Sequence, residues 1–177
     1  MNQVYKASWA QVHINDDFVC VETLSGYRMI QTDPTGAHHL LSPEASDEVL
    51  GAALLDSMAR SRFVLDEPRE GIWIHPDAEF DRELYDPRKS QVRYESWKKS
   101  LIDRYGYKSN KALFKGMKNC GVELRDASIT LTPMHHESLE GWGRTKGDGI
   151  EDVVIPADST PAEIGAALRL ALSRCTE

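Results

Sequence analysis

Apolar and polar residues alternate in two separate stretches of the chain, and the two patterns correspond. A polar turn interrupts each stretch, with Asp16 in the first and Asp126 in the second. The apolar positions that correspond are Val12, Ile14, Val19 and Val21 in the first stretch and Val122, Leu124, Ile129 and Leu131 in the second. Alternation on both sides of a turn is typical of a β-hairpin with one buried face. We therefore predict paired strands over 4–14 and 18–23, and a second hairpin that ends at Pro133.

Each hairpin is followed by a helical pattern that carries a glycine at the same place. The segment 50–54 reads LGAAL and the segment 164–168 reads IGAAL. Ser46 can cap the first helix, and Thr160 with Glu163 can form a capping box for the second. A glycine inside a helix costs about 1 kcal/mol relative to alanine. Its recurrence predicts that the backbone approaches another element closely at both glycines.

These patterns predict one α+β domain over residues 1–177, with a mainly antiparallel sheet and packed helices. The two hairpin-and-helix units predict similar halves with an insert between them. Further expected elements are strands at 27–31 and 150–155, short buried strands or extended segments at 63–65 and 72–74, and a surface loop over 77–86. We also expect a helix over 90–105 that ends at Gly106, a short helix capped by Ser109, and a flexible glycine-rich segment over 141–149.

Composition agrees with a folded protein of the cytoplasm. Apolar residues make up 41% of the chain, and no run approaches the roughly 20 apolar residues of a membrane span. The first residues show no basic segment followed by an apolar run, so we expect no signal peptide. Cys20, Cys120 and Cys175 are odd in number and far apart, which favours reduced thiols.

Charge is unevenly distributed along the chain, whose net charge is -7. The segment from Arg88 to Lys118 holds ten Lys or Arg and two acidic residues, so the rest of the chain is strongly acidic. Tyr94, Trp97, Tyr105 and Tyr107 lie among these cations, and this suggests an alternative function in binding single-stranded nucleic acid. The acidic balance of the whole chain opposes that alternative, and we expect no direct binding of nucleic acid.

Candidate catalytic and metal-binding residues are few. The pairs His38-His39 and His135-His136 are adjacent, and neighbours on a strand point to opposite faces, so neither pair can chelate a metal well alone. The chain lacks Cys-x-x-Cys and His-Glu-x-x-His spacings. A small hydrolase using His135 or His136 is the least favoured hypothesis. We expect no enzymatic activity, no cofactor and no metal.

Several motifs in the second half of the chain resemble those of a known family. They are Tyr105-Gly106-Tyr107-Lys108, the segment 112–120 (ALFKGMKNC), the pattern Pro133…His136…Leu139…Trp142, the segment 152–156 (DVVIP), and the segment from Gly165 to Cys175. The chain resembles the immunity proteins of bacterial contact-dependent growth inhibition (CDI) systems, in a branch long catalogued as a family of unknown function. The resemblance covers most of the chain, and segment 66–89 adds little to it.

The resemblance implies a cytoplasmic protein that binds and neutralises the C-terminal toxin domain of a CDI effector, without a membrane partner. Such toxins are often nucleases with basic clefts, and an acidic inhibitor would complement such a cleft. We expect the toxin to contact a stretch dense in carboxylates and bracketed by prolines: Asp77, Glu79, Asp81 and Glu83. The second choices are Asp16, Asp17, Glu151 and Asp152.

Overall fold

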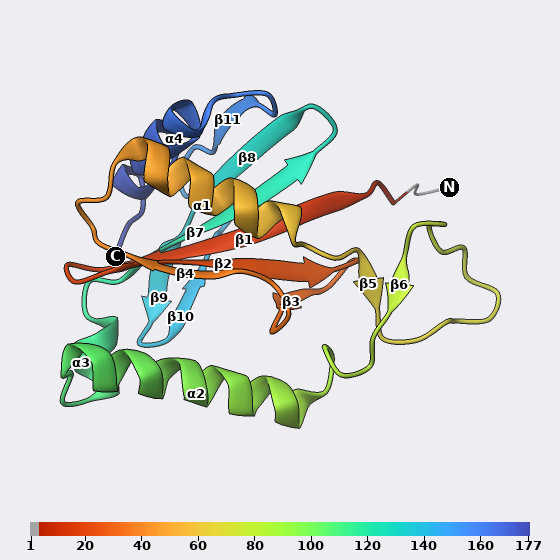
Figure 1. The fold of residues 1–177 in the computed structure, drawn as a ribbon, viewed down its shortest axis with the longest axis horizontal. Coiled ribbons are helices and arrows are strands. Elements are labelled where there is room, and N and C mark those ends of the chain that lie inside the picture. The colour runs from red at the N-terminus through yellow and green to blue at the C-terminus, as the bar shows by residue number, and fades with distance from the viewer. Residues whose placement is uncertain (1–3) are drawn as a thin grey trace.

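The computed structural model describes residues 4–177, in which one antiparallel sheet of seven strands has helices on both faces (Figure 1). The strands are β1 (Ala7–Ile14), β2 (Val19–Gly26), β3 (Ile30–Thr32), β4 (His38–Leu41), β5 (Val64–Leu65), β6 (Glu79–Phe80), β7 (Lys118–Arg125), β8 (Ser128–Pro133), β9 (His135–Ser138), β10 (Gly141–Gly143) and β11 (Val153–Pro156). The helices are α1 (Asp47–Ala59), α2 (Pro87–Tyr105), α3 (Asn110–Phe114) and α4 (Pro161–Ser173). The predicted fold class is confirmed.

The two predicted hairpins form the centre of the sheet. The strand order is β11-β8-β7-β1-β2-β3, and β4 also pairs with β2, next to β3. Val12 lies opposite Val21 in the first hairpin, and Val122 lies opposite Leu131 in the second. Residues that correspond in the two sequence patterns are therefore paired in the same way in the two hairpins. Pairing of β1 with β7 joins the two halves of the sheet.

Helices α1 and α4 pack together on one face of the sheet (Figure 1). Gly51 and Gly165 lie where the two helices approach each other most closely. A Cβ atom added to Gly51 would lie 1.7 Å from the carbonyl oxygen of Pro161, the first residue of α4. A Cβ atom added to Gly165 would lie 1.8 Å from the carbonyl oxygen of Asp47, the first residue of α1. The predicted close approach is confirmed, and it is reciprocal.

Apolar side chains of the two faces form separate clusters. Under α1 and α4, the alternate residues Ala10, Val12, Val19 and Val21 of the first hairpin join their counterparts in the second. On the opposite face, the C-terminal half of α2 and α3 cover a smaller cluster: Phe18, Cys20, Leu101, Leu113, Phe114 and Met117. Strand β2 is buried along its whole length because it is covered on both faces.

Several of the residues that begin or end the helices were predicted correctly. The side chains of Ser46 and Ser109 cap α1 and α3, and Thr160 and Glu163 form the expected capping box at α4. Gly106 ends α2 in the left-handed conformation, with φ of 72°. No helix within residues 4–177 is long and apolar enough to cross a membrane.

Other boundaries were wrong. Segment 72–74 contains no strand, and the strand predicted at 27–31 is the short β3. Helix α2 starts at Pro87 rather than at 90, because Asp86 caps it. The glycine-rich segment contributes Gly141–Gly143 to the hairpin β9–β10, and the supposed loop 77–86 contains β6 and the buried Leu84. Strand β4 was not predicted, because it follows a turn and its residues show no clear alternation.

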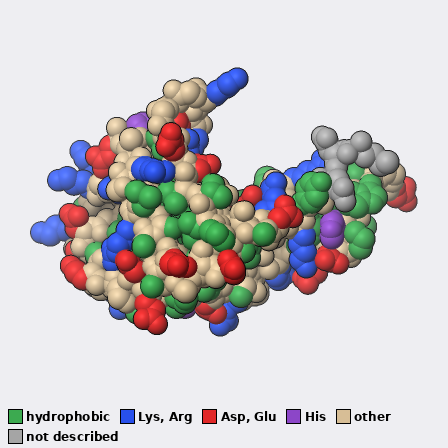
Figure 2. Space-filling model, turned by 90° about the horizontal axis from the view of Figure 1, so that it is seen from above, with side chains coloured by type: hydrophobic (Ala, Val, Ile, Leu, Met, Phe, Trp, Pro, Cys, Tyr) green, Lys and Arg blue, Asp and Glu red, His purple; other side chains and the backbone are tan. Residues whose placement is uncertain are grey.

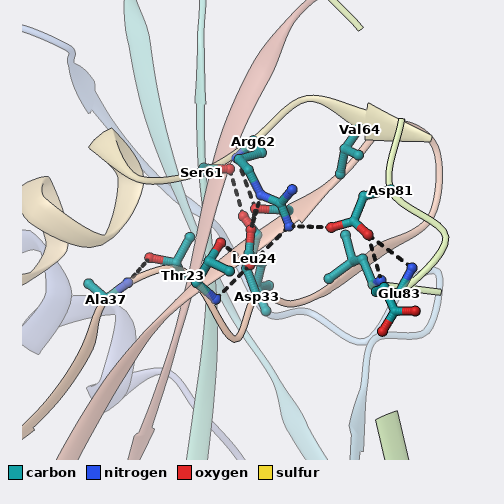
Figure 3. A network of polar contacts seen from close by, with 12 residues as sticks. Thr23, Leu24, Asp33, Ala37, Ser61, Arg62, Val64, Asp81 and Glu83 are labelled. Carbon is teal, nitrogen blue, oxygen red and sulfur yellow. Dashed lines mark hydrogen bonds and ion pairs between the residues drawn. The ribbon is translucent and has the colours of Figure 1, made fainter. Parts of the chain in front are cut away.

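A network of polar side chains links the end of α1 to the edge of the sheet (Figure 3). Arg62 donates from Nε to Oδ2 of Asp33 at 2.7 Å and from Nη2 to Oδ2 of Asp81 at 3.0 Å. Ser25 donates to Asp33 at 2.6 Å and accepts the backbone N–H of Arg62. Burial alone would raise the pKa of Asp33, but hydrogen bonds from Arg62, Ser25 and Thr35 hold it at about 2.

Because of this network, the stability of the wild-type protein is expected to fall at acidic pH. Because its pKa is lowered from 3.8 in an unfolded chain, Asp33 stabilises the fold fully above about pH 4, and this contribution disappears as the pH falls towards 2. The contribution is about 2 kcal/mol. Urea unfolding of the wild type and of Asp33→Asn should therefore give stabilities that converge as the pH is lowered. A constant difference across this range would contradict the assignment.

Candidate functional site

A cleft of about 930 Å³ lies between α2 and the sheet face opposite α1 and α4. Its walls come from β1–β4, the turn after β3, and residues from Tyr85 to Ser100. The C-terminal half of α2 packs on the sheet through Leu101 and Tyr105, whereas its N-terminal half borders the cleft. A large open cavity with a few convergent polar groups is typical of a binding site.

Strand alternation places polar groups on the sheet wall of this cleft. Gln11 and His13 come from β1, Glu22 from β2 and His38 from β4. The neighbour of His38 points the other way, because Nε2 of His39 lies 2.7 Å from Asp56 in α1. The prediction that adjacent histidines point to opposite faces is confirmed for this pair.

Burial sets the protonation of these groups. It lowers the pKa of His13 to about 4 and also lowers that of His38. It raises the pKa of Glu22 to about 7, although a hydrogen bond from Gln11 opposes the rise. The pKa of the Cys20 thiol is raised by burial and by the charge of Glu22. At neutral pH this wall therefore carries neutral imidazole and thiol groups beside one carboxyl group that is readily neutralised.

The aromatic side chains of α2 that suggested nucleic-acid binding make contacts within the protein. Trp97 packs against His13, with ring centroids 5.3 Å apart, and Tyr94 donates a hydrogen bond to Glu140 at 2.8 Å. Tyr105 stacks on Phe18. The rings that the sequence suggested as a base-stacking platform are thus partly buried and engaged within the protein. Lys98, in the same helix, is buried and paired with Glu140.

The four preferred carboxylates lie around β6, but they are not equivalent. Asp77 pairs with Lys6 at 3.3 Å, and Glu83 pairs with Lys89, in both cases with exposed side chains. Glu79 is exposed in β6. Asp81 is largely buried, pairs with Arg62 and accepts the backbone N–H of Glu83 (Figure 3). Asp81 therefore holds this segment in place, and three of the four carboxylates are accessible to a partner.

The second-choice carboxylates lie elsewhere. Asp16 and Asp17 occupy the turn before β2, whereas the 77–83 segment lies beyond the opposite end of that strand. Asp17 accepts a hydrogen bond from Tyr107. Glu151 and Asp152 precede the edge strand β11, and Asp152 pairs with Arg144 at 3.0 Å. The eight candidates therefore belong to three separate places on the molecule.

Acidic residues do not form one continuous patch on the face that Figure 2 shows. Acidic, basic and hydrophobic side chains are interspersed there, over the side of the molecule seen from above. The strong acidic excess outside segment 88–118 is therefore distributed on this face. An electrostatic role requires a local group of carboxylates rather than the net charge.

The second histidine pair is structural in this arrangement. Nδ1 of His135 lies 2.7 Å from the hydroxyl of Thr176. His136 stacks on Trp142, with centroids 4.9 Å apart, and its Nε2 lies 3.2 Å from the carbonyl oxygen of Leu139. These contacts join β9 to the C-terminus and to its own hairpin.

The cleft could not be predicted from the sequence, because the residues that line it come from elements far apart in the chain. The only sequence signal was the alternation of residues along β1 and β2. The positions between the apolar ones, on the other face of the sheet, are occupied by polar residues and a cysteine: Gln11, His13, Cys20 and Glu22. Those positions carry polar groups although β2 is buried on both faces. Polar residues at buried strand positions are a sign of a site rather than of a core.

Comparisons with known proteins agree with this architecture. The family model described as "CDI immunity protein" matches residues 8–175. The immunity protein CdiI-YPIII of Yersinia pseudotuberculosis serotype O:3 (strain YPIII) is 51% identical over 175 residues, covering 99% of each chain. A chain of the solved "CdiA-CT/CdiI toxin and immunity complex" from Yersinia pseudotuberculosis matches with a TM-score of 0.94 and 51% identity, covering 98% of this chain and 99% of that one. A Neisseria meningitidis protein of unknown function matches with a TM-score of 0.80 and 31% identity, covering 99% of both chains. The chain therefore belongs to the CDI immunity protein family.

Proposed function

We propose that this protein binds the C-terminal toxin domain of its cognate CDI effector inside the cell and blocks the activity of that domain. The observation that supports this proposal most strongly is the full-length similarity to the immunity chain of a toxin and immunity complex. The protein acts by binding and performs no chemistry on the toxin. The toxin is a nuclease, for which a basic cleft that holds phosphates would be the natural target of an acidic inhibitor.

The cleft under α2 is the best place for part of the toxin to bind. It is a large concave surface, and its walls combine apolar rings with hydrogen-bonding groups of the sheet. The segment 77–83 lies next to it in the chain, because Tyr85 and Pro87 already line the cleft. Glu83 pairs with Lys89 of α2, and Asp77 and Glu79 precede it in the same segment, so these accessible carboxylates can attract a basic partner before it docks.

Reversing these three carboxylates tests the electrostatic part of the proposal. The triple variant Asp77→Lys, Glu79→Lys and Glu83→Lys should slow association with the toxin domain about tenfold or more at low salt, because charge complementarity acts mainly on the on-rate. It should also weaken the protection of cells that express the toxin. Asp81 is left unchanged because it holds the segment together through Arg62.

A matched control reverses the exposed carboxylates of Glu48, Asp103 and Asp158, which lie on other parts of the chain. It changes the net charge equally and should alter association far less. Association kinetics can be followed by surface plasmon resonance at two salt concentrations. Equal slowing by the two triple variants would show that only net charge matters and that the 77–83 segment is not the contact.

A further inference from the structure

Three potential metal ligands of different chemistry meet at the sheet wall of the cleft, which Glu22 and His38 line and beside which Cys20 is buried. Cys20 and Glu22 are two residues apart on β2 and share a face, and His38 lies opposite Glu22 in the pairing of β2 with β4. Sγ of Cys20, a carboxylate oxygen of Glu22 and a ring nitrogen of His38 all lie within 4.8 Å of one another. The β-strand pairing, rather than any sequence motif, brings them together.

Their separations fit the edges of a coordination tetrahedron. Nε2 of His38 lies 3.5 Å from Sγ of Cys20 and 3.7 Å from Oε1 of Glu22. Zinc bonds of about 2.3 Å to sulfur and about 2.0–2.1 Å to nitrogen and oxygen give tetrahedral edges of about 3.4–3.6 Å. At the two edges that His38 forms, an ion requires side-chain shifts of only a few tenths of an ångström, and the Cys20 and Glu22 ligand atoms lie within 4.8 Å of each other.

We propose that Cys20, Glu22 and His38 form a zinc site whose fourth position opens toward the cleft. The thiol of Cys20 gives up its proton when Zn²⁺ binds, and the sulfur becomes a thiolate ligand. Sulfur, imidazole and carboxylate ligands together favour zinc over magnesium or calcium, which prefer oxygen alone. Three protein ligands leave one position for water or for a group from a partner.

The surroundings of the trio support this assignment. Nε2 of Gln11 donates to Oε2 of Glu22 at 3.3 Å and can orient the carboxylate while Oε1 faces His38. Among residues 4–177, Nδ1 of the buried His13 has no hydrogen-bond partner, and this ring lines the same cavity. A buried nitrogen without a partner is costly, so this ring can form a hydrogen bond with a group bound in the cleft.

The proposed zinc site departs from the earlier expectation that the protein binds no metal. That expectation considered ligand spacings along the chain and adjacent histidines. The ligands proposed here come from two strands, and they include neither His39 nor the pair His135-His136. The proposal does not depend on the identity of any toxin, because the ion would bind to the isolated protein.

Metal titration of the untagged, reduced and chelator-treated protein tests the site. Zn²⁺ should bind with a stoichiometry of one and raise the thermal unfolding temperature, because a ligand of the folded state stabilises it. Co²⁺ should produce a thiolate-to-metal charge-transfer band that Zn²⁺ abolishes. Cys20→Ser should remove that band, and His38→Gln or Glu22→Gln should weaken binding about tenfold or more.

Matched controls use residues of the same type outside the trio. Cys175→Ser removes a half-buried thiol elsewhere, and His39→Gln alters the neighbouring ring that contacts Asp56. Both should retain the charge-transfer band and the affinity. His38 is about half exposed, so His38→Gln should fold even if Cys20→Ser does not. Failure of Zn²⁺ and Co²⁺ to bind, or equal binding by His38→Gln and the wild type, would overturn the proposal.

Discussion

Replacing Gly51 or Gly165 by alanine is expected to destabilise the protein by about 3 kcal/mol or more, although alanine is the better helix former. Each new methyl group would lie within 2 Å of a backbone carbonyl oxygen of the partner helix. Backbone cannot rotate away as a flexible side chain can, so α1 and α4 must separate and lose packing over the central core. In a chain of this size such a loss lowers the unfolding temperature by roughly 6 °C or more.

The double variant provides a sharper test of the reciprocal contact. One separation of the helices relieves both clashes, so Gly51→Ala with Gly165→Ala should cost clearly less than the sum of the single changes. Ala52→Ser and Ala166→Ser add one atom at the neighbouring exposed positions and should change stability little. Chemical unfolding of all five variants measures this. Additive losses, or stabilisation by either alanine, would contradict the crossing described here.

Ser96→Trp is expected to weaken toxin binding about 100-fold while leaving the fold intact. Ser96 is exposed on α2 and lines the cleft, so an indole there would occupy space that the proposal assigns to the toxin. Obstruction of a docked segment by about 3 kcal/mol corresponds to that loss of affinity. Calorimetry with the toxin domain gives the affinity, and thermal unfolding gives the stability.

Lys99→Trp is the matched control for this variant. Lys99 lies on the same helix, outside the cleft, with a side chain that is 75% exposed. It introduces the same indole and should bind the toxin nearly as the wild type does. Equal affinities for Ser96→Trp, Lys99→Trp and the wild type would place the interface elsewhere.

Local and repeated features of this fold could be predicted from the sequence. The hairpins follow from strict alternation around Asp16 and Asp126, and the helix starts follow from Ser46 and Thr160. The recurrence of glycine at 51 and 165 indicated close packing because a helix would otherwise favour alanine. These signals depend on neighbours within a few residues or on a pattern that occurs twice.

Features that depend on distant pairing could not be predicted. Strand β4 has no alternation of its own and is fixed by pairing with β2. The cleft exists because α2 packs on the sheet at one end only. Asp81 looked like an exposed carboxylate of a charged loop, but Arg62 binds it from another segment. The zinc ligands proposed here share this property, since β2 and β4 must pair before they meet.

The most direct test of the proposed function is the affinity of the purified wild-type protein for the C-terminal toxin domain of its cognate CDI effector. Titration calorimetry should give a one-to-one complex with a Kd of about 10 nM or lower, because an immunity protein must silence its toxin at low copy number. The complex should also suppress the toxin's activity at equimolar ratio. Absence of binding at micromolar concentrations, with both proteins folded, would contradict the proposal.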